Sequence, residues 1–290
     1  MEITRRMNRR MFLLLSFLAA SLVLYLVPLW TLFTFAWGDE TFSYIPLVPA
    51  VSVYFLYLRR KEIFSNSDGW HLAGGCLIAL AMMLYALGAR QREILALHDY
   101  LSVMAFSFVV CCLGGLLSFC GTGAWRGAAF PIFFLLFMVP IPPIFLDRIV
   151  FVLQKWSAEA VSVFFGLTGV PLYRDGFFFH LPGLTIEVAK ECSGIRSSIS
   201  LFLVSLLAGH LMLDENWRKA VLTLSIVPIT IVKNAVRIVT LSLVAIYVDP
   251  GILGSVAHRR GGIPIFFLAL VLLGSVLWLL RRGEKKGQER

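Results

Sequence analysis

Long uncharged apolar runs constrain the fold of this chain more than any other feature. A helix needs about 20 apolar residues to cross a bilayer, because each residue adds 1.5 Å. Eight runs in the 290 residues are candidate spans: 11–37, 41–58, 69–89, 100–125, 127–146, 197–213, 220–248 and 261–280. Only 15% of the residues are charged, which is unusual for a soluble domain. We therefore expect an all-α polytopic membrane protein with about eight transmembrane helices.

The distribution of Lys and Arg predicts the orientation. The first run is too long for a signal peptide and no small-residue cleavage site follows it, so we expect an uncleaved first helix. With both termini in the cytoplasm, fifteen of the 26 Lys and Arg residues fall on the inner side. The net charge of +9 then indicates contact with anionic lipid, and no nucleic-acid partner is expected.

Residues 144–190, between the fifth and sixth runs, do not follow the membrane pattern. Apolar residues recur at helical spacing over 147–169, which predicts an amphipathic helix lying flat in the outer interface. Over 171–189, the turn dipeptides Asp175-Gly176 and Pro182-Gly183 separate alternating segments, which predicts two or three short strands forming a β hairpin. We expect one integral-membrane domain over 1–290, with 144–190 inserted as a small extracytoplasmic cap.

Cys192 is the one cysteine expected on the outer side, so it has no outer partner for a disulfide. It is either an incidental thiol or a reactive one. Ser193 is a suitable N-cap for the helix that follows, and the helix dipole and Arg196 would both favour the thiolate. Glu191 would act in the opposite direction. The other four cysteines are expected to be small apolar residues within spans.

The seventh run contains Lys233, Asn234 and Arg237. Lys233 and Arg237 are four residues apart, so they share one helix face. Charged residues within a span are costly and indicate a functional site, although an arginine near a helix end can also extend its side chain to the interface. His258 precedes the last run on the expected outer side. Because the three last runs are consecutive, we expect Cys192, Arg237 and His258 to meet there.

Two other classes of membrane protein are disfavoured. The internal repeats of many secondary transporters are not visible in the sequence. The spans also lack the clustered His and Glu residues that a metal-dependent intramembrane protease needs, so no metal and no cofactor are expected.

Three motifs together resemble the exosortase/archaeosortase family. They are the run ECSGIR at 191–196, the run NAVR at 234–237, and His258 ahead of a glycine-bearing span. The resemblance covers roughly residues 40–280 and implies Cys192 as nucleophile, with Arg237 and His258 as its catalytic partners. From their positions beside these residues, we expect supporting or substrate-binding roles for Arg196, Asn234, Lys233 and Ser193. Histidine at position 258 points to the bacterial branch. Family members often have a histidine ahead of the second span, whereas this chain has Ser43-Tyr44-Ile45.

The resemblance implies a membrane-embedded cysteine transpeptidase or protease of the bacterial inner membrane. Its partners would be exported proteins with C-terminal sorting signals of the PEP-CTERM kind, cut on the outer side of the membrane. The alternative is a non-enzymatic component of polysaccharide or glycolipid export, in which Lys233 and Arg237 bind an anionic headgroup. The sequence does not predict an oligomeric state.

Overall fold

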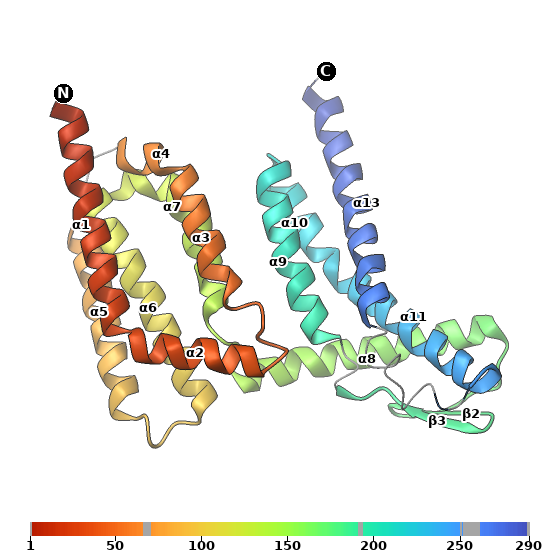
Figure 1. Cartoon of the computed structure of the whole chain (residues 1–290). Helices are drawn as coiled ribbons and strands as arrows, with labels where there is room; N and C mark the ends of the chain where they lie inside the picture. The colour runs from red at the N-terminus through yellow and green to blue at the C-terminus, as the bar shows by residue number, and fades with distance from the viewer. Residues whose placement is uncertain (1, 66–70, 191–193, 250, 252–261, 289–290) are drawn as a thin grey trace. The chain divides into compact units, whose positions relative to one another are not determined.

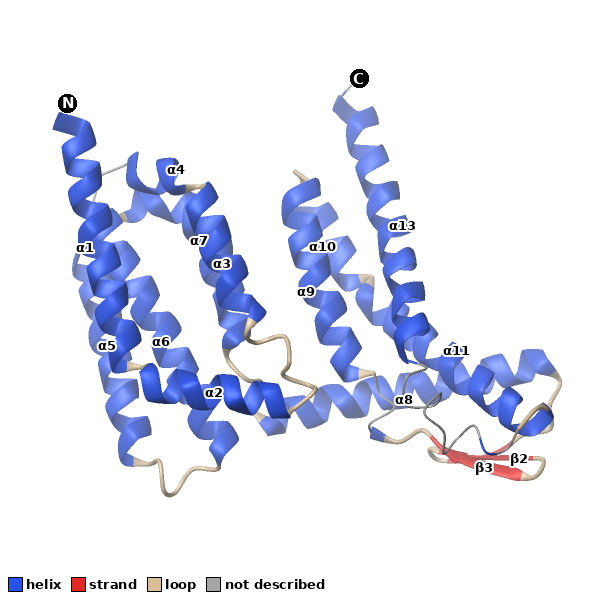
Figure 2. Ribbon diagram, in the orientation of Figure 1, coloured by secondary structure: helices blue, strands red, loops and turns tan. Residues whose placement is uncertain are grey.

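The structure is a computed structural model that describes residues 2–65, 71–190, 194–249, 251 and 262–288. It is almost entirely helical, with one small sheet (Figures 1 and 2). The chain divides into two compact units, Met1–Phe145 and Leu146–Arg290. Each unit is described by itself below.

The first unit consists of helices and turns. In chain order its elements are α1 (Glu2–Leu24), α2 (Leu26–Gly38), α3 (Leu47–Leu58), α4 (Arg60–Ser65), α5 (His71–Arg90), α6 (Leu97–Cys120), η1 (Thr122–Ala124), α7 (Trp125–Leu135) and η2 (Leu136–Met138).

The second unit contains the sheet and the remaining helices. Its elements are α8 (Pro143–Thr168), which begins in the first unit, β1 (Tyr173–Asp175), β2 (Phe178–Leu181), β3 (Leu184–Glu187), α9 (Ile195–Met212), α10 (Asn216–Leu224), α11 (Ile226–Tyr247) and α13 (Gly262–Gln288).

The all-α membrane fold is confirmed, although the number of full-length spans differs from eight. Among the described residues, six helices are long and apolar enough to cross a membrane, or seven if α1 and α2 count as one bent span. The predicted spans 41–58 and 127–146 contain only the shorter helices Leu47–Leu58 and Gly127–Met138. Prolines shorten them: Pro46 precedes α3, and Pro140 and Pro142 follow η2. The predicted interfacial helix, α8, is itself long enough to be a span.

The first predicted span bends by 69° between α1 and α2. Pro28 has no N–H to donate to the Leu24 carbonyl, four residues earlier, and its ring clashes with that carbonyl in a straight helix. The Tyr85 hydroxyl donates to the Leu24 carbonyl instead, at 3.4 Å. Proline therefore turns one expected helix into two.

Helices α5 and α6 pack closely because glycines lie at their contact. A Cβ at Gly74 would lie 2.6 Å from the Ser118 backbone nitrogen, and one at Gly114 would lie 2.9 Å from the Gly74 carbonyl oxygen. Small residues let two membrane helices approach at backbone distance. Buried hydroxyl groups also connect the two helices. Tyr25 donates a hydrogen bond to Ser107 Oγ of α6 at 2.5 Å, and Ser107 donates to the Ala81 carbonyl of α5 at 2.7 Å.

The three strands form one antiparallel sheet in the order β1-β2-β3, which confirms the predicted hairpin region. Arg174 pairs with Phe179, and Phe179 with Ile186. The turns contain Gly176 and Gly183 with φ of 59° and 73°, a conformation that favours glycine. The sheet packs on α8 and α11 through a cluster that includes Phe165, Phe179 and Val239.

Helix α8 has three faces rather than the two that its amphipathic pattern predicts. The apolar residues Ile149, Val152 and Trp156 are exposed, as lipid-facing residues would be. The charged residues Lys155 and Glu159 are also exposed. A third face is buried in the protein: Val150, Leu153, Gln154, Ser157, Ala158, Val161 and Phe165. This third face includes two buried polar residues, Gln154 and Ser157.

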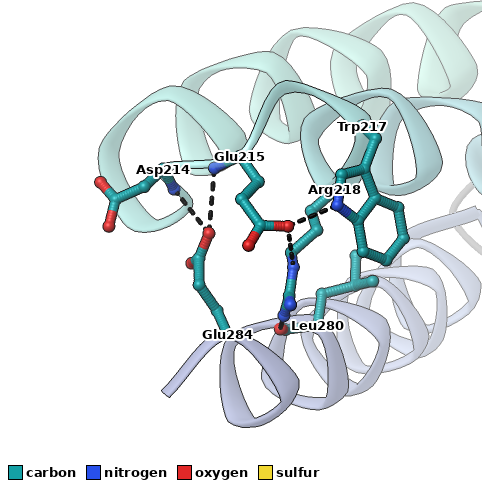
Figure 3. A network of polar contacts seen from close by, with 6 residues as sticks. All are labelled: Asp214, Glu215, Trp217, Arg218, Leu280 and Glu284. Carbon is teal, nitrogen blue, oxygen red and sulfur yellow. Dashed lines mark hydrogen bonds and ion pairs between the residues drawn. The ribbon is translucent and has the colours of Figure 1, made fainter. Parts of the chain in front are cut away.

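A polar network bonds the turn between α9 and α10 to the end of α13 (Figure 3). Glu284 accepts hydrogen bonds from the backbone N–H groups of Asp214 and Glu215, at 3.1 and 2.9 Å. Arg218 donates to Glu215 Oε2 at 2.8 Å and to the Leu280 carbonyl. Carboxylate oxygens stabilise the free N–H groups at a helix start, so Glu284 fixes α13 to the beginning of α10.

Candidate active site

Helix α11 carries the charged residues that the sequence analysis selected in the seventh span. Lys233 and Asn234 are each 2% exposed, and Arg237, one turn later, is half-buried. Pro228 lies near the start of α11 and cannot donate to the carbonyl of Leu224, where α10 ends. The described residues thus confirm that Lys233, Asn234 and Arg237 belong to one helix.

The start of α9 lies directly against α11. Helix α9 begins at Ile195, and Gly194 occupies the N-cap position with φ of 72°. A Cβ at Gly194 would lie 2.9 Å from Asn234 Oδ1, so both the backbone conformation and the contact require glycine. The prediction of Ser193 as N-cap is wrong by one residue, because the helix begins only after this left-handed glycine.

The first turn of α9 presents hydroxyl groups to Gly194 and to α11. Ser197 Oγ and Ser198 Oγ donate to the Gly194 carbonyl, at 3.0 and 2.7 Å. Lys233 Nζ donates to Ser197 Oγ. The ammonium group of α11 is therefore connected to the Gly194 carbonyl through one serine.

Helix α8 completes the arrangement from a third side. Gln154 Nε2 donates to the Val188 carbonyl at 2.6 Å, just after β3 ends. One turn later, Ser157 Oγ accepts a hydrogen bond from Asn234 Nδ2 at 3.4 Å. We call Gln154, Ser157, Ser197, Lys233 and Asn234 the polar seam, since they line the contact of α8, α9 and α11.

The polar seam contacts a described residue on each side of the segment that contains Cys192. Val188 is bonded to α8, and Gly194 is bonded within α9 and touches α11. Cys192 is two residues from Gly194, so chain connectivity keeps their Cα atoms within about 7.6 Å of each other. Gly194, two residues after the nucleophile candidate in the sequence, is in contact with Asn234.

The structure brings together some of the predicted site residues. Lys233 and Asn234 are in the polar seam, Arg237 follows them by one turn on α11, and Arg196 is exposed in the first turn of α9. Cys192, Ser193 and His258 lie outside the described residues. The predicted meeting of Cys192, Arg237 and His258 therefore stays a prediction.

The buried polar residues of α8 and Ser197 of α9 are not among the site residues predicted from the sequence. Gln154 and Ser157 are 5% and 0% exposed, respectively. They belong to a stripe that also contains Val150, Val161 and Phe165, at spacings of three and four residues. A search for a second helical stripe in residues 143–168 would have found it.

Metal ligands are not grouped in the part of the chain that the structure describes. No set of three or more His, Cys, Asp or Glu side chains there could hold a metal ion. Cys111, Cys112 and Cys120 are buried, whereas Cys76 is exposed on α5. Burial of the first three agrees with their predicted role as small apolar side chains.

A model of the transmembrane exosortase family matches residues 36–275, which is most of the chain. The chain belongs to the transmembrane exosortase family. Neither the curated proteins nor the solved structures provide a match. Membership identifies the protein as a multi-pass membrane protein and supports a membrane-embedded sorting transpeptidase that acts on exported proteins with sorting signals. The matched range contains the polar seam and the residues between Val188 and Gly194.

Proposed function

We propose that this exosortase is a cysteine transpeptidase that cleaves C-terminal sorting signals through an acyl-enzyme on Cys192. One observation supports the proposal most strongly. Val188 and Gly194, which flank the segment that contains Cys192, are each bonded to a residue of the polar seam, and Arg237 lies one turn along α11 from Lys233. Holding the residues that flank a nucleophile limits the positions that the nucleophile can take, which favours a reactive geometry.

The proposed reaction has two balanced halves. The Cys192 thiolate attacks the carbonyl carbon of the scissile peptide, and Arg237 stabilises the oxyanion that forms. The C–N bond then breaks, and His258 donates a proton to the leaving amine. An incoming amine, or water, attacks the thioester, gives its proton to His258, and releases the thiolate.

The substrates in this proposal are exported proteins that end in a PEP-CTERM-like signal. Such a signal has a short motif, a transmembrane helix and a basic tail. The proposed site faces the outer side of a bacterial inner membrane, with both termini of the chain in the cytoplasm and basic residues against anionic lipid. Residues 144–190 would then form an extracytoplasmic cap.

The alternative, an export component with an intramembrane anion site, is less consistent with the burial of Lys233. A residue that lines a path for a lipid or polysaccharide headgroup must be reachable from that path, and the Lys233 side chain is 2% exposed. Its hydrogen bond goes to Ser197 of the neighbouring helix. A structural role within the polar seam fits these contacts better.

Cleavage of a co-expressed substrate tests the proposal. Because Cys192→Ala removes the nucleophile, we expect it to lower the cleavage rate at least about 10³-fold. The matched control is Cys76→Ala, which removes an exposed thiol of α5 and leaves cleavage unchanged. Arg237→Ala and His258→Ala should also lose most activity. If Cys192→Ala cleaves normally while Arg237→Ala abolishes export of a polysaccharide, the export alternative is correct.

Thiol labelling tests the proposed orientation. In intact spheroplasts, a membrane-impermeant maleimide should label Cys192 and none of the other four cysteines. After permeabilisation, Cys76 becomes the internal positive control because it is exposed near the expected inner end of α5. Labelling of Cys192 only after permeabilisation would reverse the proposed topology.

A further inference from the structure

Strand β3 (Leu184–Glu187) lies at one edge of the small sheet. Within the part of the chain that the structure describes, β3 pairs with β2 on one side, and no strand pairs with it on the other. An edge strand presents unpaired backbone N–H and C=O groups to any extended chain that comes beside it. Proteins often block such an edge with lysine or proline, and the sequence Leu-Thr-Ile-Glu contains neither.

The hydrogen bonds within the sheet determine which residues of β3 direct their backbone groups outward. In an antiparallel pair of strands, hydrogen-bonded and non-hydrogen-bonded residue pairs alternate. The N–H of Val188 donates to the Phe177 carbonyl at 3.0 Å, so the next pair toward the turn, which contains Glu187, is non-hydrogen-bonded. Alternation makes the pair that contains Thr185 the same kind. The N–H and C=O groups of Thr185 and Glu187 therefore point to the open edge.

The inner face of β3 is covered only in part. Phe179 and Leu181 of the central strand are 0% and 7% exposed. Leu184 and Ile186 of β3 pack on the same apolar cluster but are only half-buried. A fourth strand would place every second side chain on this face and cover the remaining apolar surface. The edge therefore suits an extended segment that has apolar side chains at alternate positions.

The sheet is fixed to α8, so its edge has a defined position. Beside the bond from its N–H to β2, Val188 accepts a hydrogen bond at its carbonyl from Gln154 Nε2 of α8, at 2.6 Å. Arg174 of β1 forms two hydrogen bonds with the Glu159 carboxylate of α8, at 2.9 and 3.0 Å. An isolated hairpin is marginally stable in water, whereas a sheet packed on a helix can bind a partner without first becoming ordered.

The opposite edge of the sheet, β1 (Tyr173–Asp175), offers less backbone for pairing. The backbone of Phe179 is directed to β3, because its pair with Ile186 is hydrogen-bonded, so its pair with Arg174 on the other side is not. Arg174 is therefore the one residue of β1 whose backbone groups point outward. Its side chain is already bonded to α8.

We propose that β3 is the docking edge for the exported substrate of this exosortase: an extended segment ahead of the substrate's transmembrane helix pairs with Thr185 and Glu187 as a fourth strand. This inference rests on the proposed function and states how its substrate is recognised. Peptides that add a strand to a sheet gain affinity from main-chain hydrogen bonds and specificity from alternate side chains. The binding surface consists of β3 alone.

A second copy of the chain is a less suitable occupant of this edge. Two outward-facing residues allow about four backbone hydrogen bonds. Such a short pair of strands buries far less than the roughly 1,200 Å² that a stable protein interface needs. A substrate whose own helix lies in the same membrane has a high effective concentration at the edge, so a few hydrogen bonds are sufficient for it.

Disulfide crosslinking in membranes tests the pairing. The probe is an exported reporter domain fused to a C-terminal sorting signal from the same genome, with single cysteines at successive positions ahead of its transmembrane helix. In a Cys192→Ala background, Thr185→Cys should link only to alternate positions, because neighbouring residues of a strand point to opposite faces. Tyr173→Cys is the matched control. Tyr173 is exposed in the same row of the sheet as Thr185, on the opposite edge, and should give no links.

A proline variant tests the same edge by activity. Thr185→Pro removes an N–H that the sheet itself does not use, so the unfolding temperature should stay close to that of wild type. It should lower kcat/KM for the reporter about tenfold, mainly by raising KM, because a hydrogen bond to the bound segment is lost and the proline ring obstructs the edge. Thr185→Val keeps the N–H and should stay within about threefold of wild type. If Thr185→Pro does not fold, the crosslinking decides.

The inference is overturned if Thr185→Cys links to no position or to all positions equally, or if Tyr173→Cys links as well as Thr185→Cys. A disulfide between two copies of the Thr185→Cys chain in place of the substrate link would also overturn it, and so would a folded Thr185→Pro that cleaves as fast as wild type. Crosslinking does not need catalysis. It therefore separates this inference from the proposed function, which fails if Cys192→Ala still cleaves the sorting signal.

Discussion

The contact of α5 with α6 in the first unit and the polar seam in the second unit represent two ways of packing membrane helices. In the first, Gly74 and Gly114 bring two backbones together, and the buried hydroxyls of Tyr25 and Ser107 satisfy one another. In the second, a buried lysine and a buried asparagine each contact a serine of another helix. The first arrangement consists of neutral groups, while the second contains an ionisable group whose burial must be offset. The comparison indicates that burial of the polar seam has an electrostatic cost that the contact of α5 with α6 avoids.

The largest expected effect is a loss of stability in the first unit. Gly74→Leu would force a side chain to within 2.6 Å of the Ser118 backbone nitrogen, which cannot move without separating the helices. Overpacking of this kind costs about 3 kcal/mol, so the apparent unfolding temperature and the yield of folded protein should fall sharply. Gly75→Ala is the control, because a Cβ at Gly75 meets nothing within 4 Å. Equal stability of the two variants would show that the glycine contact is unimportant.

A smaller loss of stability but a larger loss of activity is expected in the polar seam. Gly194→Ala places a side chain in a left-handed conformation and 2.9 Å from Asn234 Oδ1, a strain of about 2 kcal/mol. Cleavage per folded molecule should also fall, because Gly194 lies two residues after the proposed nucleophile Cys192. Combining Gly194→Ala with Asn234→Ala removes the clash and should recover part of the stability. Strictly additive losses in this double-mutant cycle would contradict the contact.

Ser107→Ala tests whether the buried hydroxyls of the first unit contribute to stability and not to cleavage. The substitution leaves the Tyr25 hydroxyl and the Ala81 carbonyl without their buried partner. It should destabilise the protein by about 1 to 2 kcal/mol, measured by thermal unfolding, since unsatisfied buried groups lose their full hydration. Cleavage per folded molecule should stay at the wild-type value. A specific loss of activity would remove the distinction between the two regions.

The smallest expected effect concerns the acid sensitivity of the network in Figure 3. The hydrogen bond from Arg218 lowers the pKa of the Glu215 carboxyl below its usual value, and Trp217 acts in the same direction. Because the folded-state pKa is depressed, this contribution to stability is present above the unfolded value of 4.5 and is lost as pH falls through the folded value. Glu215→Gln should therefore flatten the fall of the unfolding temperature below pH 4.5 slightly. An unchanged slope would show that Glu215 does not contribute.

Much of the fold could be predicted because hydrophobic length and turn chemistry are local properties. The runs 69–89 and 100–125 are found as α5 and α6, and the glycines at 176 and 183 form the turns of the predicted sheet. The predicted helices were wrong where a proline interrupts an apolar run, as Pro28 does in the first span. Hydropathy does not distinguish proline by its missing N–H, so the bend could not be predicted from it. The faces of α8 were also assigned incompletely, because an exposed apolar stripe and a buried one look alike in a membrane protein.

The sequence by itself determined the class of protein, the grouping of Lys233, Asn234 and Arg237 on one helix, and the family motifs around Cys192. Composition and helical spacing suffice for these, since they depend on neighbours along the chain. Only the tertiary structure decided that Ser197 of α9 and Ser157 of α8 are partners of Lys233 and Asn234, and that Gln154 of α8 donates to the Val188 carbonyl. Hydrogen-bond partners in a bundle are chosen by how helices distant in sequence pack, and a buried polar group is satisfied by whichever helix lies beside it.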